Sequence, residues 1–365
     1  MAVVDGGLWS RHRGTFADIH LECIETVDRK TDYRNNPHSV IACPSMMSSL
    51  MRLLDHVAFR RFRPKASNLI DSNSLEHCSS DKPVPAFSHN ALAALTGAVL
   101  LLSSAASAGG YEHVRIPNDD GQIDAVLYRP AGPGPFPAVV ALHGCNGLWR
   151  DNGTLSLRHS DWGEQLAQAG LMVLMPDSYG SRRLGSQCGV KDVTVRPSRE
   201  RVADAAAARR WLQTREDVRA DMIALMGWSG GGSAVLAAIR KDRRPADGKP
   251  DFARAIAFYP SCRQQSESAS FAARLPVLIL VGEADDWTPP APCDFLAKAA
   301  QARGEKVDLV VYAGAVHDFD HPRLEVKERS DIAYSATGTG KAMVGTNPAA
   351  REDALKRVKA FLKGL

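Results

Sequence analysis

The sequence lacks the patterns that would place it among cofactor-dependent or metal-dependent proteins. It contains no H-E-x-x-H motif, no paired C-x-x-C motif and no G-x-G-x-x-G motif after a first strand, so neither a metal ion nor a nucleotide cofactor is expected. Its 45 Lys and Arg residues outnumber its 41 Asp and Glu residues by only four. Because these charges are spread along the chain, no clustered basic patch predicts a nucleic-acid partner.

Long hydrophobic runs are also missing. The longest, over residues 91–102, has twelve apolar or small residues, which is too short to span a bilayer comfortably. Small residues follow and end in an A-x-A pattern at Ala108, which is typical of a signal peptidase site. We interpret residues 89–108 as a signal-peptide-like segment, with a buried or membrane-associated helix as the alternative. Cleavage predicts a periplasmic or secreted protein without a stable membrane anchor, and no cleavage predicts a cytoplasmic one.

Residues 1–88 show neither sustained alternation nor a sustained helical stripe, so we expect a poorly structured N-terminal extension. A signal peptide should not begin ninety residues into a chain, so we expect the written start to lie upstream of the true one. The folded domain is expected over residues 109–365.

Within that domain, strand and helix patterns alternate. The expected strands are residues 111–116, 123–128, 136–142, 171–175, 222–226, 253–258, 276–281 and 306–312. The expected helices are residues 162–169, 199–213, 295–303 and 349–362, with a further helix directly after Gly232. This exchange predicts an α/β fold with a mostly parallel sheet and helices on both faces. Its ligands should bind at the carboxyl ends of the strands.

The most informative stretch is the G-x-S-x-G pattern at Gly227, Ser229 and Gly231, between an apolar strand and an Ala-rich helix. It predicts a nucleophile elbow, in which a serine on a strained turn exposes its hydroxyl above the sheet. The alternative is a glycine-rich helix entry or anion site without chemistry.

A serine nucleophile needs a histidine base and an acid that orients the base, and in folds with this elbow the acid and then the histidine follow the serine in the chain. His317 and Asp285 both follow expected strands. We favour Asp285 over its neighbour Asp286, with Glu283 as a remoter acid and His321 as a reserve base. The alternatives are an ordinary surface histidine and a turn-forming acid.

The oxyanion of a tetrahedral intermediate needs backbone donors. We expect the N–H of Gly230 and that of Cys145, which lies in the loop after the strand over residues 136–142. We interpret His143 in the same loop as a structural residue.

Several loop residues are candidates for substrate contact. They are Tyr179, Arg182, Trp228 and Trp287, because aromatic walls hold acyl or ring groups and arginine binds carboxylates. The alternatives are a solvated arginine and a Trp228 that packs beneath the elbow. Residues 321–348 are expected to form a long loop at the pocket mouth.

Five motifs, in this order, resemble those of the dienelactone hydrolase family of α/β-hydrolases: HGCNG, PDSYGSR, GWSGGG, GEADDWTP and AVHDFD. The resemblance covers roughly residues 111–365 and implies Ser229 as nucleophile, His317 as base and Asp285 as acid. Family members that open dienelactones have cysteine at the elbow, so this chain resembles a serine-nucleophile variant, the arrangement of general carboxylesterases.

Four cysteines lie in loops at strand ends of the expected domain. Their even number, downstream of a signal-like segment, suggests two disulfides. We favour Cys262 with Cys293 and Cys145 with Cys188, although the sequence does not fix the pairing and reduced thiols are the alternative.

Together these features predict a serine hydrolase that cleaves a small carboxylic ester or lactone through an acyl-enzyme, without a cofactor. They indicate no particular oligomeric state. A serine peptidase of the same fold would normally carry a large extra domain, for which about 255 residues leave no room. A non-catalytic binding protein would not require the serine, acid and histidine together.

Overall fold

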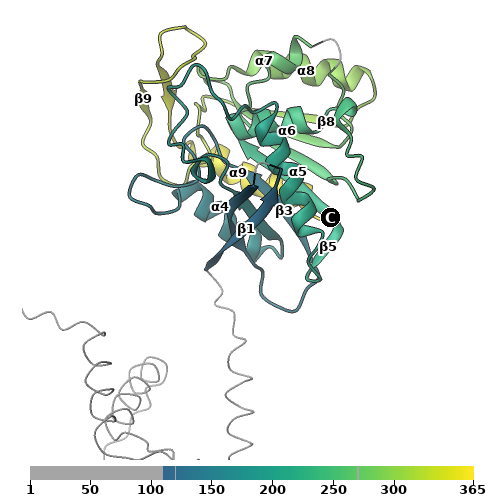
Figure 1. Ribbon diagram of the computed structural model, residues 1–365. Helices are drawn as coiled ribbons and strands as arrows, with labels where there is room; N and C mark the ends of the chain where they lie inside the picture. The colour runs from purple at the N-terminus through teal and green to yellow at the C-terminus, as the bar shows by residue number, and fades with distance from the viewer. Residues whose placement is uncertain (1–109, 120, 269–270) are drawn as a thin grey trace, which may run out of the picture. The chain divides into compact units, whose positions relative to one another are not determined.

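An eight-stranded sheet lies at the centre of the computed structural model, which describes residues 110–119, 121–268 and 271–365 (Figure 1). Its strands are β1 (Tyr111–Asn118), β2 (Gly121–Tyr128), β3 (Phe136–Leu142), β4 (Met172–Pro176), β5 (Val218–Trp228), β6 (Arg254–Phe258), β7 (Val277–Gly282) and β8 (Val307–Tyr312). Their spatial order is β1-β2-β4-β3-β5-β6-β7-β8. The pairs β1–β2 and β2–β4 are antiparallel, and all other pairs in this sheet are parallel. The expected extension and signal-like segment lie outside the described residues.

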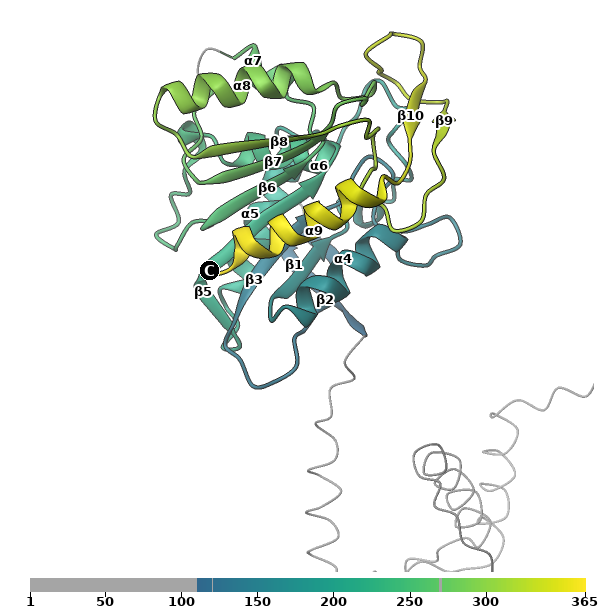
Figure 2. The ribbon, with the colours of Figure 1, turned by 180° about the vertical axis from the view of Figure 1, so that it is seen from behind.

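Helices cover both faces of the sheet, as expected. One face packs against α5 (Glu200–Leu212), α6 (Gly230–Ala238) and α8 (Pro290–Ala302). The other packs against α4 (Leu157–Gln168) and α9 (Pro348–Leu362), which stand in front of the sheet in Figure 2. Three shorter helices are η1 (Gly180–Arg182), η2 (Lys241–Arg243) and α7 (Arg263–Ser266). None of the helices described is long and apolar enough to cross a membrane.

Strand β3 shows why the central strands are uninterrupted apolar runs. Its Val139 and Ala141 face the α4 and α9 side, whereas Ala138, Val140 and Leu142 face the α5, α6 and α8 side. Successive side chains of a strand point to opposite faces, so a strand between two helical layers must be apolar at every position. All five side chains are fully buried.

Two helices begin five residues earlier than the sequence predicts. Helix α8 starts at Pro290 and so includes Cys293, which was expected in a loop, and α4 starts at Leu157. Proline is compatible with the first helical turn because the N–H that it lacks has no partner there anyway. Similarly, α9 begins with Pro348 after Asn347, whose side chain accepts a hydrogen bond from the Ala350 N–H at 3.1 Å.

Strand structure also extends further than expected. Strand β5 begins at Val218, four residues before the expected start, in a half-exposed stretch whose polar residues hid the pattern. Within the expected long loop over residues 321–348, β9 (Lys327–Arg329) and β10 (Ala342–Val344) form an antiparallel pair, set apart from the main sheet in Figure 2. An isolated β-bridge joins Val344 of β10 to His317, so the β9–β10 pair lies beside the loop that follows β8.

Candidate active site

Ser229 occupies a strained turn between β5 and α6. Its φ of +52° is in the range that side-chain-bearing residues rarely adopt, which costs roughly 1–3 kcal/mol. A Cβ at Gly227 would come within 2.5 Å of the Gly231 backbone, and one at Gly231 within 2.1 Å of the Leu142 oxygen. Both glycines of the motif are therefore required by the close approach of β5, α6 and the end of β3.

His317, after β8, is held by Asp285, after β7. Its Nδ1 lies 2.7 Å from Asp285 Oδ2, and the two side chains are nearly fully buried. The other carboxylate oxygen accepts hydrogen bonds from the N–H groups of Trp287 at 2.9 Å and Thr288 at 2.8 Å. Because the carboxylate accepts the Nδ1 proton, the Nε2 of the imidazole is left as a proton acceptor.

The other sequence candidates lie elsewhere. Asp286 accepts a hydrogen bond from the Met343 N–H at 2.8 Å, and Glu283 accepts one from the Gly314 N–H at 3.0 Å. His321 accepts a hydrogen bond from the Arg323 N–H at 3.1 Å. Of the three acids, Asp285 is the one paired with His317.

Two aromatic rings enclose the imidazole of His317. The ring centroid of Tyr259 is 4.4 Å away and that of Trp287 is 4.7 Å away. Burial lowers the pKa of His317, but the adjacent Asp285 carboxylate raises it, and the net result is a pKa above the ordinary value. Thr288 adds a hydroxyl within 3.1 Å of both Asp285 Oδ2 and His317 Nδ1.

The loop after β3 lies against the elbow. The Cys145 nitrogen is 3.9 Å from the point that a Cβ would occupy at Gly230, so the two expected oxyanion donors are neighbours. His143 supports this loop, because its Nδ1 donates to the Gly144 oxygen at 2.8 Å and its Nε2 accepts from the Ser178 N–H at 3.1 Å. Burial and the nearby Arg201 hold the pKa of His143 well below its ordinary value, so the ring is neutral.

A fully buried arginine, Arg201 of α5, stands behind the loop. Its Nη2 donates to the His143 oxygen at 2.6 Å, and its guanidinium lies 5.2 Å from the ring centroid of Tyr179. Its Nε and Nη1 have no hydrogen-bond partner among the described residues. A buried cation with unmet donors is costly and calls for a functional explanation.

Two disulfides lie near the elbow, and three of their four cysteines are in loops, whereas Cys293 lies in α8 instead of the expected loop. They link Cys145 to Cys188 and Cys262 to Cys293, the pairing favoured from the sequence. The first ties the loop of the expected oxyanion donor to the segment after η1, where the Gln187 N–H also donates to the Cys145 oxygen at 2.8 Å.

A buried carboxylate that the sequence analysis did not single out joins the histidine loop to the elbow. Asp320 accepts hydrogen bonds from Trp162 Nε1 and Trp228 Nε1, each at 2.8 Å, and from the Tyr259 hydroxyl at 2.6 Å. These donors come from α4, from the end of β5 and from the residue directly after β6. The sequence signal for this network is weak, because an Asp three residues after a histidine is uninformative without its distant partners.

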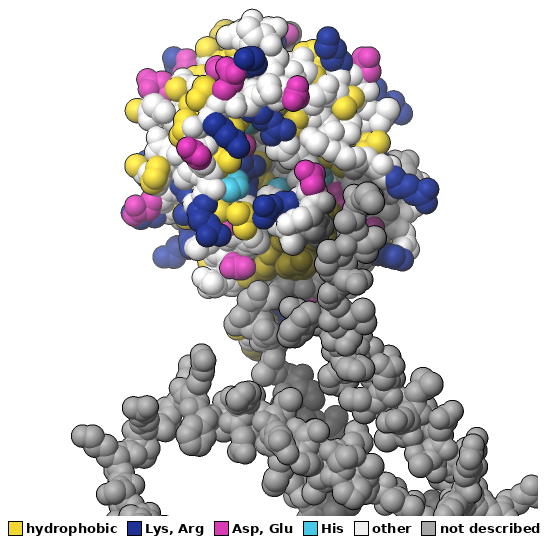
Figure 3. All heavy atoms as spheres, turned by 90° about the vertical axis from the view of Figure 1, so that its left-hand side faces the viewer, with side chains coloured by type: hydrophobic (Ala, Val, Ile, Leu, Met, Phe, Trp, Pro, Cys, Tyr) yellow, Lys and Arg dark blue, Asp and Glu magenta, His cyan; other side chains and the backbone are white. Residues whose placement is uncertain are grey.

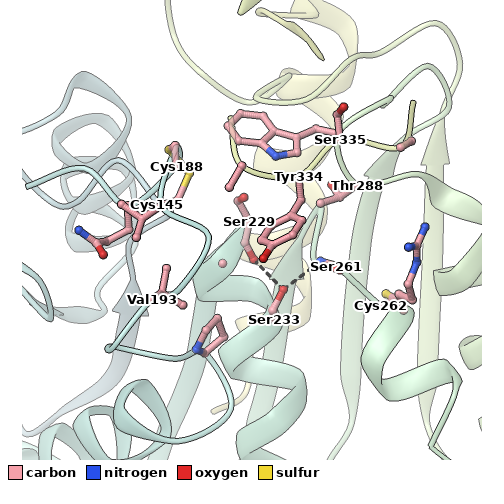
Figure 4. Close-up of a pocket in the computed structure, with 18 of the residues that line it drawn as sticks. Cys145, Cys188, Val193, Ser229, Ser233, Ser261, Cys262, Thr288, Tyr334 and Ser335 are labelled. Carbon is pink, nitrogen blue, oxygen red and sulfur yellow. Dashed lines mark hydrogen bonds between the residues drawn. A yellow bond between two sulfur atoms is a disulfide. The ribbon is translucent and has the colours of Figure 1, made fainter. Parts of the chain in front are cut away.

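Ser229 lines two cavities. The first, of about 460 Å³, is also lined by Cys145, Gly230, Tyr179 and Trp287 (Figure 4). The second, of about 870 Å³, is also lined by His317, Cys145 and Trp287. Among the described residues, no group of three or more His, Cys, Asp or Glu side chains could hold a metal ion.

Two substrate-contact candidates line neither cavity. Trp228 is fully buried and donates to Asp320, as in the alternative that it packs beneath the elbow. Arg182 forms a bidentate ion pair with Asp204, in which its two Nη atoms donate to the two carboxylate oxygens at 2.8 and 3.0 Å. The protein itself therefore holds both side chains, which corrects the expectation that they face a ligand. Tyr179 and Trp287 do line a cavity.

The sheet order, the helices on both faces and the elbow after β5 define the α/β-hydrolase class. Within this class, the model of the dienelactone hydrolase family matches residues 123–365, and the chain belongs to that family. It is a hydrolase of carboxylic esters or lactones.

Three known proteins illustrate the relationship. A "Probable 2-oxo-3-(5-oxofuran-2-ylidene)propanoate lactonase" of Bradyrhizobium sp is 27% identical over 58% of this chain and 84% of its own length. A "Putative carboxymethylenebutenolidase" of Methylorubrum extorquens is 27% identical over 56% of this chain and 71% of its own length. The solved structure of a "Putative Dienelactone Hydrolase" from Klebsiella pneumoniae subsp. pneumoniae is similar in fold, with 19% identity, a TM-score of 0.52 and coverage of 70% and 99% of the two chains.

Proposed function

We propose that the chain is a serine esterase with Ser229 as nucleophile, His317 as general base and Asp285 as the acid that orients it. The observation that carries this proposal is the buried pair of His317 and Asp285, at 2.7 Å, on a cavity that Ser229 also lines. A histidine with one nitrogen fixed by a carboxylate has its other nitrogen available for the serine proton.

The reaction proceeds in two halves. His317 Nε2 takes the proton of the Ser229 hydroxyl as its oxygen attacks the ester carbonyl, and the N–H groups of Gly230 and Cys145 stabilise the oxyanion. The protonated histidine gives its proton to the leaving alcohol, which leaves an acyl group on Ser229. A water molecule, deprotonated by the same histidine, then releases the acid and restores the serine.

The test is hydrolysis of short p-nitrophenyl esters by the full chain, beside Ser229→Ala and with labelling by a fluorophosphonate. Turnover and labelling should both disappear in the variant. Ser160→Ala, in α4 and in the lining of neither cavity, is the matched control. Absence of turnover and labelling in a folded wild-type protein would contradict the proposal, and so would a variant that retains either property.

We also propose that the protein is exported, with residues 89–108 as its signal segment. The two disulfides support this, because disulfides persist in oxidising compartments. N-terminal sequencing of protein from its own host should give a start near residue 109. An intact residue 1 would contradict export through this segment.

A further inference from the structure

The two cavities that meet at Ser229 differ in chemistry. The first is mainly apolar, and Arg263 is the one charged side chain among the described residues that line it. Its apolar wall includes Val190, Val193, Val195, Trp287 and Tyr334. Figure 4 shows Ser229 between the side that carries Cys145 and Val193 and the side that carries Thr288 and Cys262. Such a cavity favours a hydrocarbon group.

The second cavity is polar and carries charges of both signs. Its lining includes Arg150, Asp151, Arg158, Asp318, Lys327, Glu328 and Arg329. Several are already paired: Arg158 with Asp318 at 2.5 Å, and Glu328 with Lys341 at 2.8 Å. Figure 3, which faces the side of the molecule that carries β9, shows histidine side chains between Lys and Arg side chains. Hydroxyl groups, which both donate and accept hydrogen bonds, match such a lining better than a hydrocarbon chain does.

The catalytic groups divide between these cavities. Gly230 lines only the first cavity, whereas His317 lines only the second. In the proposed mechanism His317 protonates the departing oxygen, so the alcohol part of the ester must lie on the side of the second cavity. The acyl part, attached to the carbonyl carbon at Ser229, is then directed into the first.

From this division we infer that the substrate is an open-chain ester of an apolar carboxylic acid and a hydroxyl-bearing alcohol. The inference rests on the proposed serine esterase function. A small lactone joins its acyl and alkoxy ends through a short ring and cannot place them in two separate cavities. Of the two bond types that the family cleaves, the open-chain ester is therefore the better substrate here.

The first experiment compares three compounds with a four-carbon acyl group, namely glycerol monobutyrate, butyl butyrate and γ-butyrolactone. The expected kcat/KM is at least about 10-fold higher for glycerol monobutyrate than for butyl butyrate, which corresponds to about one well-made hydrogen bond. The lactone should be the slowest. A lactone that is cleaved fastest, or a butyl ester that matches the glycerol ester, would overturn the inference.

The second experiment varies the acyl chain of p-nitrophenyl esters from acetate to hexanoate. Each buried methylene should raise kcat/KM about fourfold. Val193→Trp, which fills the first cavity, should lower the ratio of kcat/KM for hexanoate to that for acetate. Val311→Trp, at an exposed position of β8, should leave that ratio unchanged. Should Val193→Trp not fold, Val193→Ala should raise the preference for longer chains instead. A flat chain-length series, or equal ratios in the Val193 and Val311 variants, would overturn the assignment.

The two proposals fail in different ways. Acetate turnover that is lost in Ser229→Ala, together with a flat chain-length series, would leave the serine esterase standing and remove the subsite assignment. Absence of any turnover that depends on Ser229 would remove both.

Discussion

The carboxylates beside His317 and the groups beside Ser229 differ in how completely their hydrogen bonds are satisfied. Around His317, the Asp285 carboxylate accepts several hydrogen bonds, and Asp320 nearby accepts three more. On the serine side, Ser229 has a strained backbone and Arg201 is buried with unmet donors. The hydrogen bonds beside His317 add to the stability of the fold. The strained turn at Ser229 and the buried guanidinium of Arg201 reduce that stability, so stability does not explain why they are present. Substitutions on the two sides should therefore separate stability from activity.

The largest effect is expected on the histidine side, from Asp285→Asn. The amide cannot accept the Nδ1 proton in the same way, so kcat should fall by about 10⁴-fold through loss of the productive tautomer. Asp286→Asn is the matched control, because the Asp286 carboxylate accepts a hydrogen bond from the Met343 N–H and none from His317. Steady-state kinetics on a p-nitrophenyl ester measures both variants. Equal losses would contradict the distinction between the two neighbours.

The buried arginines give the next comparison. Arg201→Met should lower kcat by about 10-fold, less than the 10²–10³-fold loss of a direct oxyanion donor, because Arg201 acts by holding the His143 carbonyl. Its melting temperature should not fall, since an unpaired buried charge is removed. Arg158→Met removes the partner of Asp318 and Asp320 and should reduce the free energy of unfolding by about 3–5 kcal/mol. Calorimetry that shows the same loss in both variants would refute the contrast.

The pH dependence sharpens the same contrast. His317 must be neutral to act as the proposed base, and its pKa is raised above the ordinary value of 6.5, so kcat/KM should fall with decreasing pH along a limb centred above pH 6.5. The residual activity of Asp285→Asn should show this limb at lower pH, because burial then acts on the imidazole without the carboxylate. His143 and His159 should not contribute, since their pKa values lie well below the ordinary value. If the acid limb of the kcat/KM profile of Asp285→Asn stays at the wild-type pH, a group other than His317 produces that limb.

The smallest change in stability is expected from the strained turn at Ser229. Ser229→Gly should abolish turnover yet stabilise the fold by about 1 kcal/mol, because glycine adopts positive φ without strain. For a domain of this size that corresponds to roughly 2–4 °C in melting temperature. Ser233→Gly, within α6, should instead destabilise by about 1 kcal/mol. A Ser229→Gly variant that melts below the wild type would show that the turn is not strained.

How far the sequence predicts this molecule depends on how local each feature is. Gly227, Ser229 and Gly231 act within one turn, so their pattern is visible in the sequence. Asp285 and His317 were expected because the ends of parallel strands meet at one edge of the sheet. The roles of Thr288 and Asp320 were not expected, because they depend on side-chain packing that no spacing encodes. The β9–β10 pair, with three residues in each strand, is too short to show a period.

The position of Asp320 in the chain sets the order in which parts of the site appear during synthesis. It follows its partners Trp162 and Trp228 by 158 and 92 residues. At synthesis rates of about 5–20 residues per second, the elbow precedes the histidine loop by roughly 5–18 seconds. A growing chain therefore contains the turn at Ser229 long before it contains His317 and the Asp320 carboxylate that anchors the loop of His317. If the proposed triad acts, hydrolysis can begin only after this later segment has been synthesised.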